Sequence, residues 1–170
     1  MLLLGEIPFK WKLVQIYLIP KNNDWNFDLN NIRPIALIET FRKCTTKILA
    51  KRISQIMQKE NILRGPNYAG LPGDSTETPV YVLNNLIEDA KENQREMWII
   101  FQDMKKAFDS VSLKALKLAL ERIKIPIITI NLILSLFDKR EVKIITTYGT
   151  TDTFQTSDGI DQSEVLSPLL

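Results

Sequence analysis

Two aspartates, Asp103 and Asp109, follow an apolar run at residues 97–101 and are the residues best suited to chemistry in this sequence. The run, Met-Trp-Ile-Ile-Phe, has the length and composition of a buried β-strand. A carboxylate at the end of a buried strand is costly unless another group pairs with it. A divalent cation is one such partner, because Mg²⁺ prefers hard oxygen donors. A metal ion bound at Asp103 is therefore one way in which the cost of burying this carboxylate could be offset.

The chain that positions this carboxylate has 170 residues, of which 45% are hydrophobic and 25% charged, as expected of one globular domain with a core. Its net charge is only +2, but the charges are unevenly placed. Residues 1–60 contain ten Lys and Arg against five Asp and Glu, whereas residues 141–170 contain one against five. This distribution fits a basic face with an acidic rim, and it also fits ordinary solvated helix faces.

Strands and helices are expected to alternate irregularly, which favours an α+β fold with a mixed or antiparallel sheet over a doubly wound sheet. Strands rich in large and β-branched residues are predicted at 11–20, 32–38 and 97–101, with a hairpin at 142–147 and 153–156. Helices are predicted at 39–61, 77–96, 113–123 and 127–139, and a Gly- and Pro-rich connection at 64–79.

The first predicted helix, residues 39–61, has two contrasting faces. Its expected apolar arc consists of Ile48, Leu49, Ile53, Ile56 and Met57. Lys43, Lys47 and Lys51 recur every four residues and share the opposite face. Such a row is either the solvated side of the helix or a surface for nucleic acid. The second helix, 77–96, is expected to turn Leu83, Leu86, Ile87 and Ala90 inward.

Several classes of protein are disfavoured by composition. One cysteine, Cys44, cannot form an internal disulfide, and without any histidine a zinc site is implausible. The apolar start at residues 1–4 is too short for a signal peptide, and no stretch approaches the length of a membrane span. We therefore expect an intracellular protein without a membrane partner.

Four segments, in order, resemble motifs of reverse transcriptases, in particular those of non-LTR retroelements. The first two, residues 7–21 and the IRPIAL sequence at 32–37, resemble the start of the fingers and a fingers motif usually written Arg-Pro-Ile-Ser-Leu. The third, MWIIFQDMKKAFDSV at 97–111, resembles polymerase motif A. The fourth, GIDQSEVLSPLL at 159–170, is similar to motif B, Gly-x-x-Gln-Gly-x-x-x-Ser-Pro-Leu-Leu.

This resemblance implies a partial right-hand polymerase, with a fingers-like region at residues 1–96 and part of the palm at 97–170. It implies template-directed deoxynucleotide addition, with an RNA template, a DNA primer and deoxynucleotides as partners. Nucleotide addition is an in-line phosphoryl transfer that uses two Mg²⁺ ions about 3.5–4 Å apart. Asp103 and the Met104 carbonyl would be the metal ligands from motif A. Asp109 matches a common family residue for which a surface or capping role is expected.

The same resemblance implies roles in nucleotide binding. Phe108 matches the steric gate, whose ring excludes the 2′-hydroxyl that distinguishes ribonucleotides, although an aromatic residue here could also belong to the core. Arg33 would contact the triphosphate through its forked donors, with Lys21 as a weaker candidate. Gln162 would touch the nucleotide or the template base. Template-backbone contacts would come from Lys43, Lys47, Lys51 and Arg52.

The sequence departs from the family pattern in three places. Ser163 replaces a usual glycine, which would provide close approach or a positive φ, and Lys105-Lys106 replaces an acidic–basic pair. No aromatic-x-Asp-Asp sequence, the family's motif C, and no thumb segment occur in these 170 residues. We therefore expect negligible polymerase activity from this polypeptide. It would be a polymerase fragment, a non-catalytic nucleic-acid-binding remnant or a non-functional product.

Overall fold

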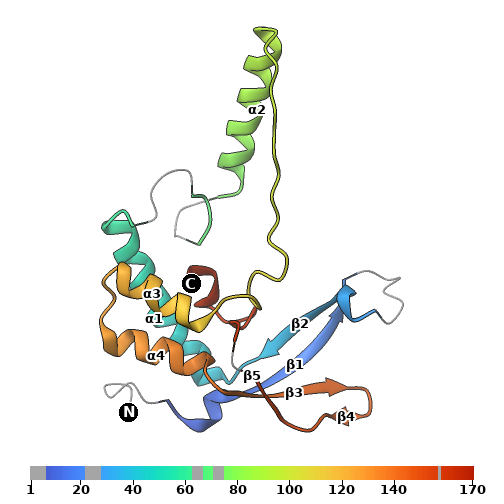
Figure 1. Ribbon diagram of the computed structural model, residues 1–170, viewed down its shortest axis with the longest axis vertical. Coiled ribbons are helices and arrows are strands. Elements are labelled where there is room, and N and C mark those ends of the chain that lie inside the picture. Colours follow the sequence, from blue (N-terminus) through green and yellow to red (C-terminus); the bar gives the residue numbers. More distant parts are fainter. Residues whose placement is uncertain (1–6, 22–27, 63–66, 71–74, 157) are drawn as a thin grey trace. The chain divides into compact units, whose positions relative to one another are not determined.

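The computed structural model describes residues 7–21, 28–62, 67–70, 75–156 and 158–170 (Figure 1). The chain divides into two compact units. The first unit contains residues 1–49, 106–168 and 170, and the second contains residues 50–105 and 169. Part of the predicted connection at 64–79 lies outside the described residues, at 64–66 and 71–74.

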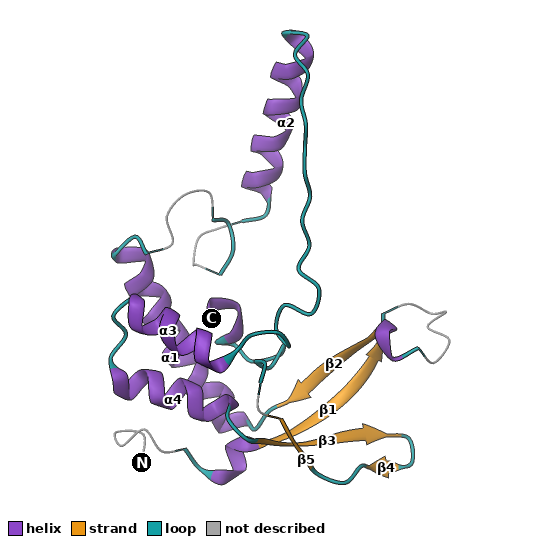
Figure 2. Cartoon of the chain, in the orientation of Figure 1, coloured by secondary structure: helices purple, strands orange, loops and turns teal. Residues whose placement is uncertain are grey.

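The first unit is built on a mixed sheet, which Figure 2 shows in orange. Strand β1 pairs antiparallel with β2 and parallel with β3, and β3 pairs antiparallel with both β4 and β5. The strands are β1 (Leu13–Pro20), β2 (Ile32–Leu37), β3 (Arg140–Thr146), β4 (Gly149–Thr150) and β5 (Phe154–Thr156). Two predicted strands and the predicted hairpin are thus confirmed, and the sheet with its helices confirms the α+β class.

The register of the sheet separates a buried face from an exposed one. Val14 pairs with Val142, and these two side chains form a buried cluster with Ala36 and Ile38. Successive side chains of a strand point to opposite faces. Tyr17 therefore lies on the other face, paired with Ile35 on β2 and Ile145 on β3, and it is exposed. Arg33 pairs with Ile19 and belongs to this exposed face.

Two helices complete the first unit, α3 (Leu113–Arg122) and α4 (Ile127–Phe137), and they pack on each other. Both helices were predicted from the sequence, but they end one and two residues earlier than predicted. Helix α4 ends at Phe137 because Asp138 is extended and Lys139 adopts a left-handed φ of 50°, which turns the chain into β3. Their buried side chains include Leu116, Leu120, Ile130, Ile133, Leu136 and Phe137.

Helix α1 (Thr40–Lys59) begins in the first unit and continues into the second. The expectation that Ile48 and Ile56 face inward was wrong, because they are 56% and 50% exposed. A helix of this kind buries one stripe of residues. Here the buried stripe contains a charged residue and two polar ones, and it consists of Arg42, Thr46, Ala50, Ile53, Ser54 and Met57.

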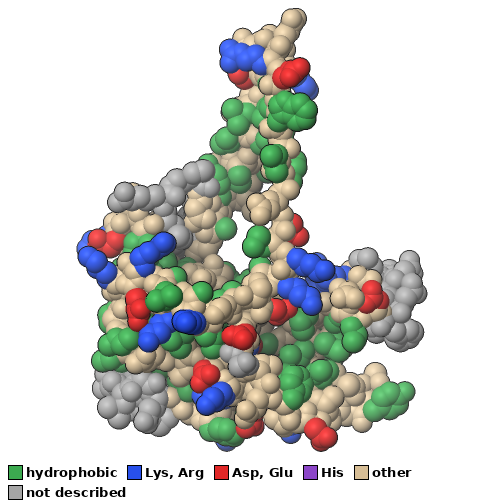
Figure 3. Space-filling view, viewed as in Figure 1, with side chains coloured by type: hydrophobic (Ala, Val, Ile, Leu, Met, Phe, Trp, Pro, Cys, Tyr) green, Lys and Arg blue, Asp and Glu red, His purple; other side chains and the backbone are tan. Residues whose placement is uncertain are grey.

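The second unit contains α2 (Glu77–Glu92), none of whose residues is buried. The predicted inward residues Leu83, Ile87 and Ala90 are half-buried, and Leu86 is exposed. Figure 3 shows hydrophobic side chains, in green, at the surface along α2 and the segment that follows it. The pattern therefore identified the helix correctly, but its apolar face does not form a core in the described part of the chain.

The predicted buried strand at residues 97–101 was wrong. These residues form an irregular extended segment, in which Trp98 is 89% and Ile100 is 91% exposed. A strand requires a hydrogen-bonded neighbour, and the described residues of the second unit contain no strand with which this segment could pair. Among the described residues, no helix is both long and apolar enough to cross a lipid bilayer.

Candidate functional site

The segment that resembles motif B forms a tight turn in the first unit. The backbone N–H of Glu164 donates to the Asp161 carbonyl at 3.1 Å, which closes a four-residue turn at residues 161–164. The Asp161 and Glu164 carboxylates are buried, whereas Gln162 between them is exposed. The turn therefore presents Gln162 to solvent while its two ends are held inside the protein.

One arginine from helix α1 holds both ends of this turn. The guanidinium of Arg42 donates from Nε to Glu164 Oε2 at 2.9 Å and from Nη2 to Asp161 Oδ2 at 2.8 Å. Its Nη1 donates to the Trp11 carbonyl at 2.6 Å. Arg42 is fully buried, and the donors of an arginine form a rigid planar fork. These three bonds therefore fix the two carboxylates relative to each other.

A second arginine, from β3, supports the same segment. Arg140 Nη1 donates to the other oxygen of Asp161, and Nη2 donates to the carbonyls of Asp158 and Gly159 at 2.9 and 3.1 Å. Each guanidinium carbon lies within 6 Å of the centre of the buried Phe137 ring, a distance compatible with cation–π attraction. Two arginines and two carboxylates thus form a balanced cluster, the buried ionic cluster.

The two residues that precede the turn are hydrogen-bonded to the segment that carries Phe108. The N–H of Ile160 donates to the Phe108 carbonyl at 2.9 Å, and the N–H of Gly159 donates to the Val111 carbonyl at 3.0 Å. Gly159 has a φ of +80°, and a Cβ placed on it would lie 3.0 Å from the Asp109 carbonyl oxygen. Only glycine allows both this conformation and this approach of two backbones. Phe108, which is half-buried, therefore lies beside the start of the turn.

The turn is also hydrogen-bonded to β2, the edge strand that carries Arg33. The hydroxyl of Ser163 donates to the Ala36 carbonyl. Ser163 is not among the described non-glycine residues with a positive φ. A serine at this position thus needs no left-handed backbone, and it adds a bond to β2. The first unit thereby brings together the segments of Arg33, Phe108 and Gln162, which lie far apart in the sequence.

The remaining predicted nucleotide-binding residue, Lys21, follows β1. Its Nζ donates to the Asn30 carbonyl at 3.0 Å, and its backbone N–H donates to the Asn31 carbonyl at 2.8 Å. An ammonium group has three donors. The Lys21 side chain is exposed and so retains donors for an anionic ligand.

Asp103 and Met104 lie in the irregular segment of the second unit, and both are exposed. Asp103 has no ion pair with any residue that the structure describes. Within the described ranges, no three Asp, Glu, Cys or His residues gather where they could hold a metal ion. The described residues around Asp103 therefore form an incomplete ligand set for Mg²⁺.

Four basic residues of α1 other than Arg42 are accessible. Lys47, Lys51 and Arg52 are exposed, and Lys43 is half-buried. Within the described residues, none of these four side chains forms an ion pair. No described residue thus neutralises their charges, and free positive charge is what a phosphate-binding surface requires.

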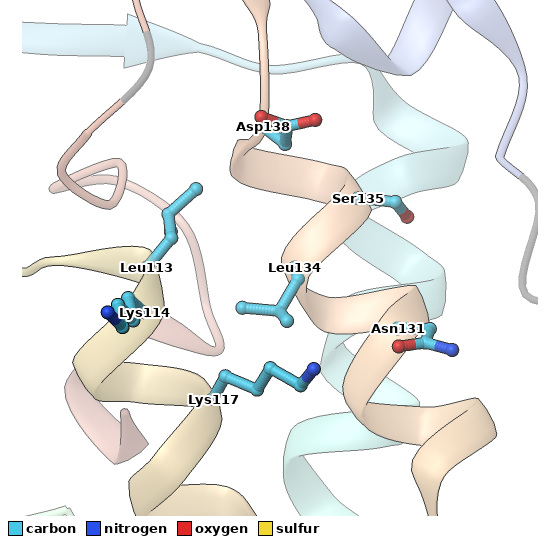
Figure 4. A pocket seen from close by; sticks show the side chains of 7 residues that line it. All are labelled: Leu113, Lys114, Lys117, Asn131, Leu134, Ser135 and Asp138. Atoms are coloured by element: carbon cyan, nitrogen blue, oxygen red, sulfur yellow. The ribbon is translucent and has the colours of Figure 1, made fainter.

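A groove of about 450 Å³ lies between α3 and α4 (Figure 4). Lys117 extends from α3 toward α4, and Leu134 faces it. None of the predicted site residues lines this groove. The groove is therefore separate from the turn and its contacts.

Sequence reasoning missed the buried ionic cluster. Arg42 and its partners Asp161 and Glu164 are 119 and 122 residues apart in the chain, so no local pattern links them. One signal was present. Arg42 shares a helical face with Ala50, Ile53 and Met57, and a charged residue on an apolar face requires a buried partner.

Comparison with known proteins gives an independent indication of ancestry. A family model described as "Reverse transcriptase (RNA-dependent DNA polymerase)" matches residues 19–170 of this chain. That range includes the segments of Arg33, Phe108 and Gln162, as well as both aspartates of the segment that resembles motif A. The match thus covers most of the first unit and all of the second.

Individual relatives agree with the family match. The "Retrovirus-related Pol polyprotein from type-1 retrotransposable element R2" of Popillia japonica is 30% identical over 99% of this chain and 23% of its own length. The protein of the same description from Nasonia vitripennis is 27% identical, over 98% of this chain and 16% of its own length. The "Probable RNA-directed DNA polymerase from transposon BS" of Drosophila melanogaster is 30% identical, over 61% of this chain and 12% of its own length. The chain thus spans less than a quarter of each of these relatives.

Proposed function

This chain belongs to the reverse transcriptase (RNA-dependent DNA polymerase) family, and we propose that it forms the nucleotide-binding part of such a polymerase within a longer protein. In this proposal residues 1–96 are the fingers region and residues 97–170 are the first part of the palm. The observation that carries it is the segment 159–164, in which the N–H of Ile160 donates to the Phe108 carbonyl and the hydroxyl of Ser163 donates to the Ala36 carbonyl on the strand of Arg33. Three segments with family roles in nucleotide binding are thereby assembled in one unit.

Each residue in this assembly has a distinct task. The guanidinium of Arg33, exposed on the open face of the sheet, binds the triphosphate oxygens, with the Lys21 ammonium as a second cation. The ring of Phe108 lies under the sugar and selects deoxynucleotides by excluding a 2′-hydroxyl. Gln162 contacts the nucleotide or the template base that pairs with it. An RNA template and a DNA primer are the expected nucleic-acid partners.

Members of the family generally use divalent metal ions, and we assign Mg²⁺ to this protein. Asp103 and the Met104 carbonyl would hold it, and the bound ion would stabilise charge on the reacting phosphate. The described residues bring no three Asp, Glu, Cys or His side chains together around a metal position, so the site is incomplete in this part of the chain. The expectation that the 170-residue chain alone does not extend a primer stays a prediction.

Nucleotide binding can be tested without catalysis. Arg33→Ala is expected to weaken binding of a deoxynucleoside triphosphate about tenfold, because a charge-assisted bond to phosphate is lost. The measurement is equilibrium titration of the purified chain, in the presence of Mg²⁺ and an RNA-template/DNA-primer duplex. Arg122→Ala is the matched control, because Arg122 is exposed on α3 and forms no ion pair with any described residue. Equal affinity of both variants would refute the proposal.

A second candidate function, nucleic-acid binding without catalysis, is favoured by Lys43, Lys47, Lys51 and Arg52 of α1, which form no ion pair with any described residue. Removing two phosphate contacts from single-stranded RNA should reduce the slope of log affinity against log salt by about 1.4. We expect this change for Lys47→Ala/Lys51→Ala, measured by fluorescence anisotropy between low and moderate salt. The double variant Lys114→Ala/Lys117→Ala removes two charges from α3 and should leave the slope nearly unchanged. An equal reduction in both double variants would argue against a specific role of α1.

A further inference from the structure

Two buried carboxylates hold the two ends of the turn that presents Gln162. Asp161 and Glu164 are the first and fourth residues of this turn, and both bind the guanidinium of Arg42. With its ends fixed inside the protein, the turn has Gln162 and Ser163 at its apex. We infer that Arg42 is a positioning residue, which sets the place of Gln162 for contact with the nucleotide. The inference rests on the proposed function in one respect, namely that Gln162 contacts the nucleotide.

The geometry of Arg42 suits this task because one rigid group spans both ends of the turn. Its Nε binds Glu164 and its Nη2 binds Asp161, while its Nη1 is held by the Trp11 carbonyl, outside the turn. The planar guanidinium fixes the separation of the two carboxylates. A lysine at this position would keep the charge, but its ammonium is a point charge without the fork.

Other groups of the buried ionic cluster hold each carboxylate in one orientation. Arg140 binds the second oxygen of Asp161. The hydroxyl of Thr46 and the backbone N–H of Val165 donate to Glu164 Oε1. Each carboxylate is therefore bound on both of its oxygens, so that it cannot rotate without losing hydrogen bonds. The position of the turn then depends on Arg42, which is the residue that both carboxylates share.

Amide hydrogen exchange tests this role directly on the 170-residue chain. In Arg42→Lys, the amides of Glu164 and Val165 should exchange about tenfold faster, because charge-assisted bonds at the ends of the turn are lost. The amides of β1 and β3 should change much less. Arg122→Lys, an identical change at an exposed position, is the matched control. Unchanged exchange at Glu164 and Val165 in Arg42→Lys would overturn the inference.

A second variant covers the case in which Arg42→Lys does not fold. Thr46→Val removes one donor to Glu164 Oε1 while it preserves the side-chain shape and all four charges of the buried ionic cluster. Faster exchange confined to the amides of Glu164 and Val165 supports the inference. Equal acceleration in β1 and β3 would show that the cluster is a general structural element, and would overturn a specific positioning role.

Nucleotide titration connects the turn to the proposed function. Gln162→Ala should weaken binding of a deoxynucleoside triphosphate. Arg42→Lys should weaken the same binding in the chain that has Gln162, but not in the Gln162→Ala variant. A double-mutant cycle measures this dependence. If Gln162→Ala weakens binding and the effects are additive, the positioning role is overturned and the proposed function stands. If Gln162→Ala has no effect while exchange at the turn is faster, the contact of Gln162 with the nucleotide is refuted.

Discussion

Arg42→Met is expected to lower the free energy of unfolding by about 3–5 kcal/mol, because it leaves the buried Glu164 carboxylate without a partner charge. Glu164 would lose its only ion pair among the described residues, and Asp161 would retain only Arg140. The cost arises from unpaired buried charge rather than from lost volume, since methionine fills much of the same space. Urea denaturation followed by circular dichroism measures the difference.

Two further variants separate charge from packing. Arg122→Met, at an exposed position of α3, should change stability by less than about 0.5 kcal/mol. Arg42→Met/Glu164→Gln removes the orphaned carboxylate together with the arginine, so that it should be more stable than Arg42→Met alone. A double variant that is as unstable as the sum of the two single changes would show that the charges of the cluster are not coupled.

The parts of the fold that sequence predicts well are those governed by local periodicity. Strands β1 and β2 and helices α3 and α4 lie within a few residues of their expected positions, because each has a side-chain pattern that repeats within the element itself. The run at 97–101 has an equally strong strand pattern. It is not a strand, because a strand must pair with a neighbouring strand. The described residues of the second unit contain no other strand.

The same distinction applies to the candidate site. Arg33, Phe108 and Gln162 are recognisable because each belongs to a short motif, and a motif can be read without knowing the fold. How the three segments are joined depends on contacts between distant residues. These include the hydrogen bond from Ser163 to Ala36, which are 127 residues apart in the sequence, and the ion pair from Arg42 to Glu164, which are 122 residues apart. One local clue was overlooked, the presence of Arg42 on the buried face of its helix.

The exposed face of the sheet and the segment that resembles motif A both carry exposed large side chains. Tyr17 and Arg33 on the sheet, and Trp98 and Ile100 in the second unit, are exposed in the described structure. Large apolar side chains at a surface commonly mark places where another chain segment or ligand binds.

Gly159→Ala is expected to lower the free energy of unfolding by about 3–5 kcal/mol, through backbone strain and a steric clash together. Gly159 has a φ of +80°, and the added Cβ would lie 3.0 Å from the Asp109 carbonyl oxygen and 3.1 Å from the Asp109 Cα. Both neighbouring atoms are backbone, so that relief requires the turn to move away from the Phe108 segment. The measurement is again urea denaturation, with nucleotide titration as a second readout.

Gly149→Ala is the control that separates strain from clash. Gly149 has a φ of +124° at the hairpin, and a Cβ there would meet no atom within 4 Å. This substitution should cost about 1–3 kcal/mol from strain alone, and it should leave nucleotide affinity unchanged. If Gly159→Ala costs no more than Gly149→Ala and binds nucleotide equally well, close approach of the turn to the Phe108 segment is unimportant. If only Gly159→Ala loses nucleotide affinity, that approach is what places Phe108 and Gln162 around one substrate.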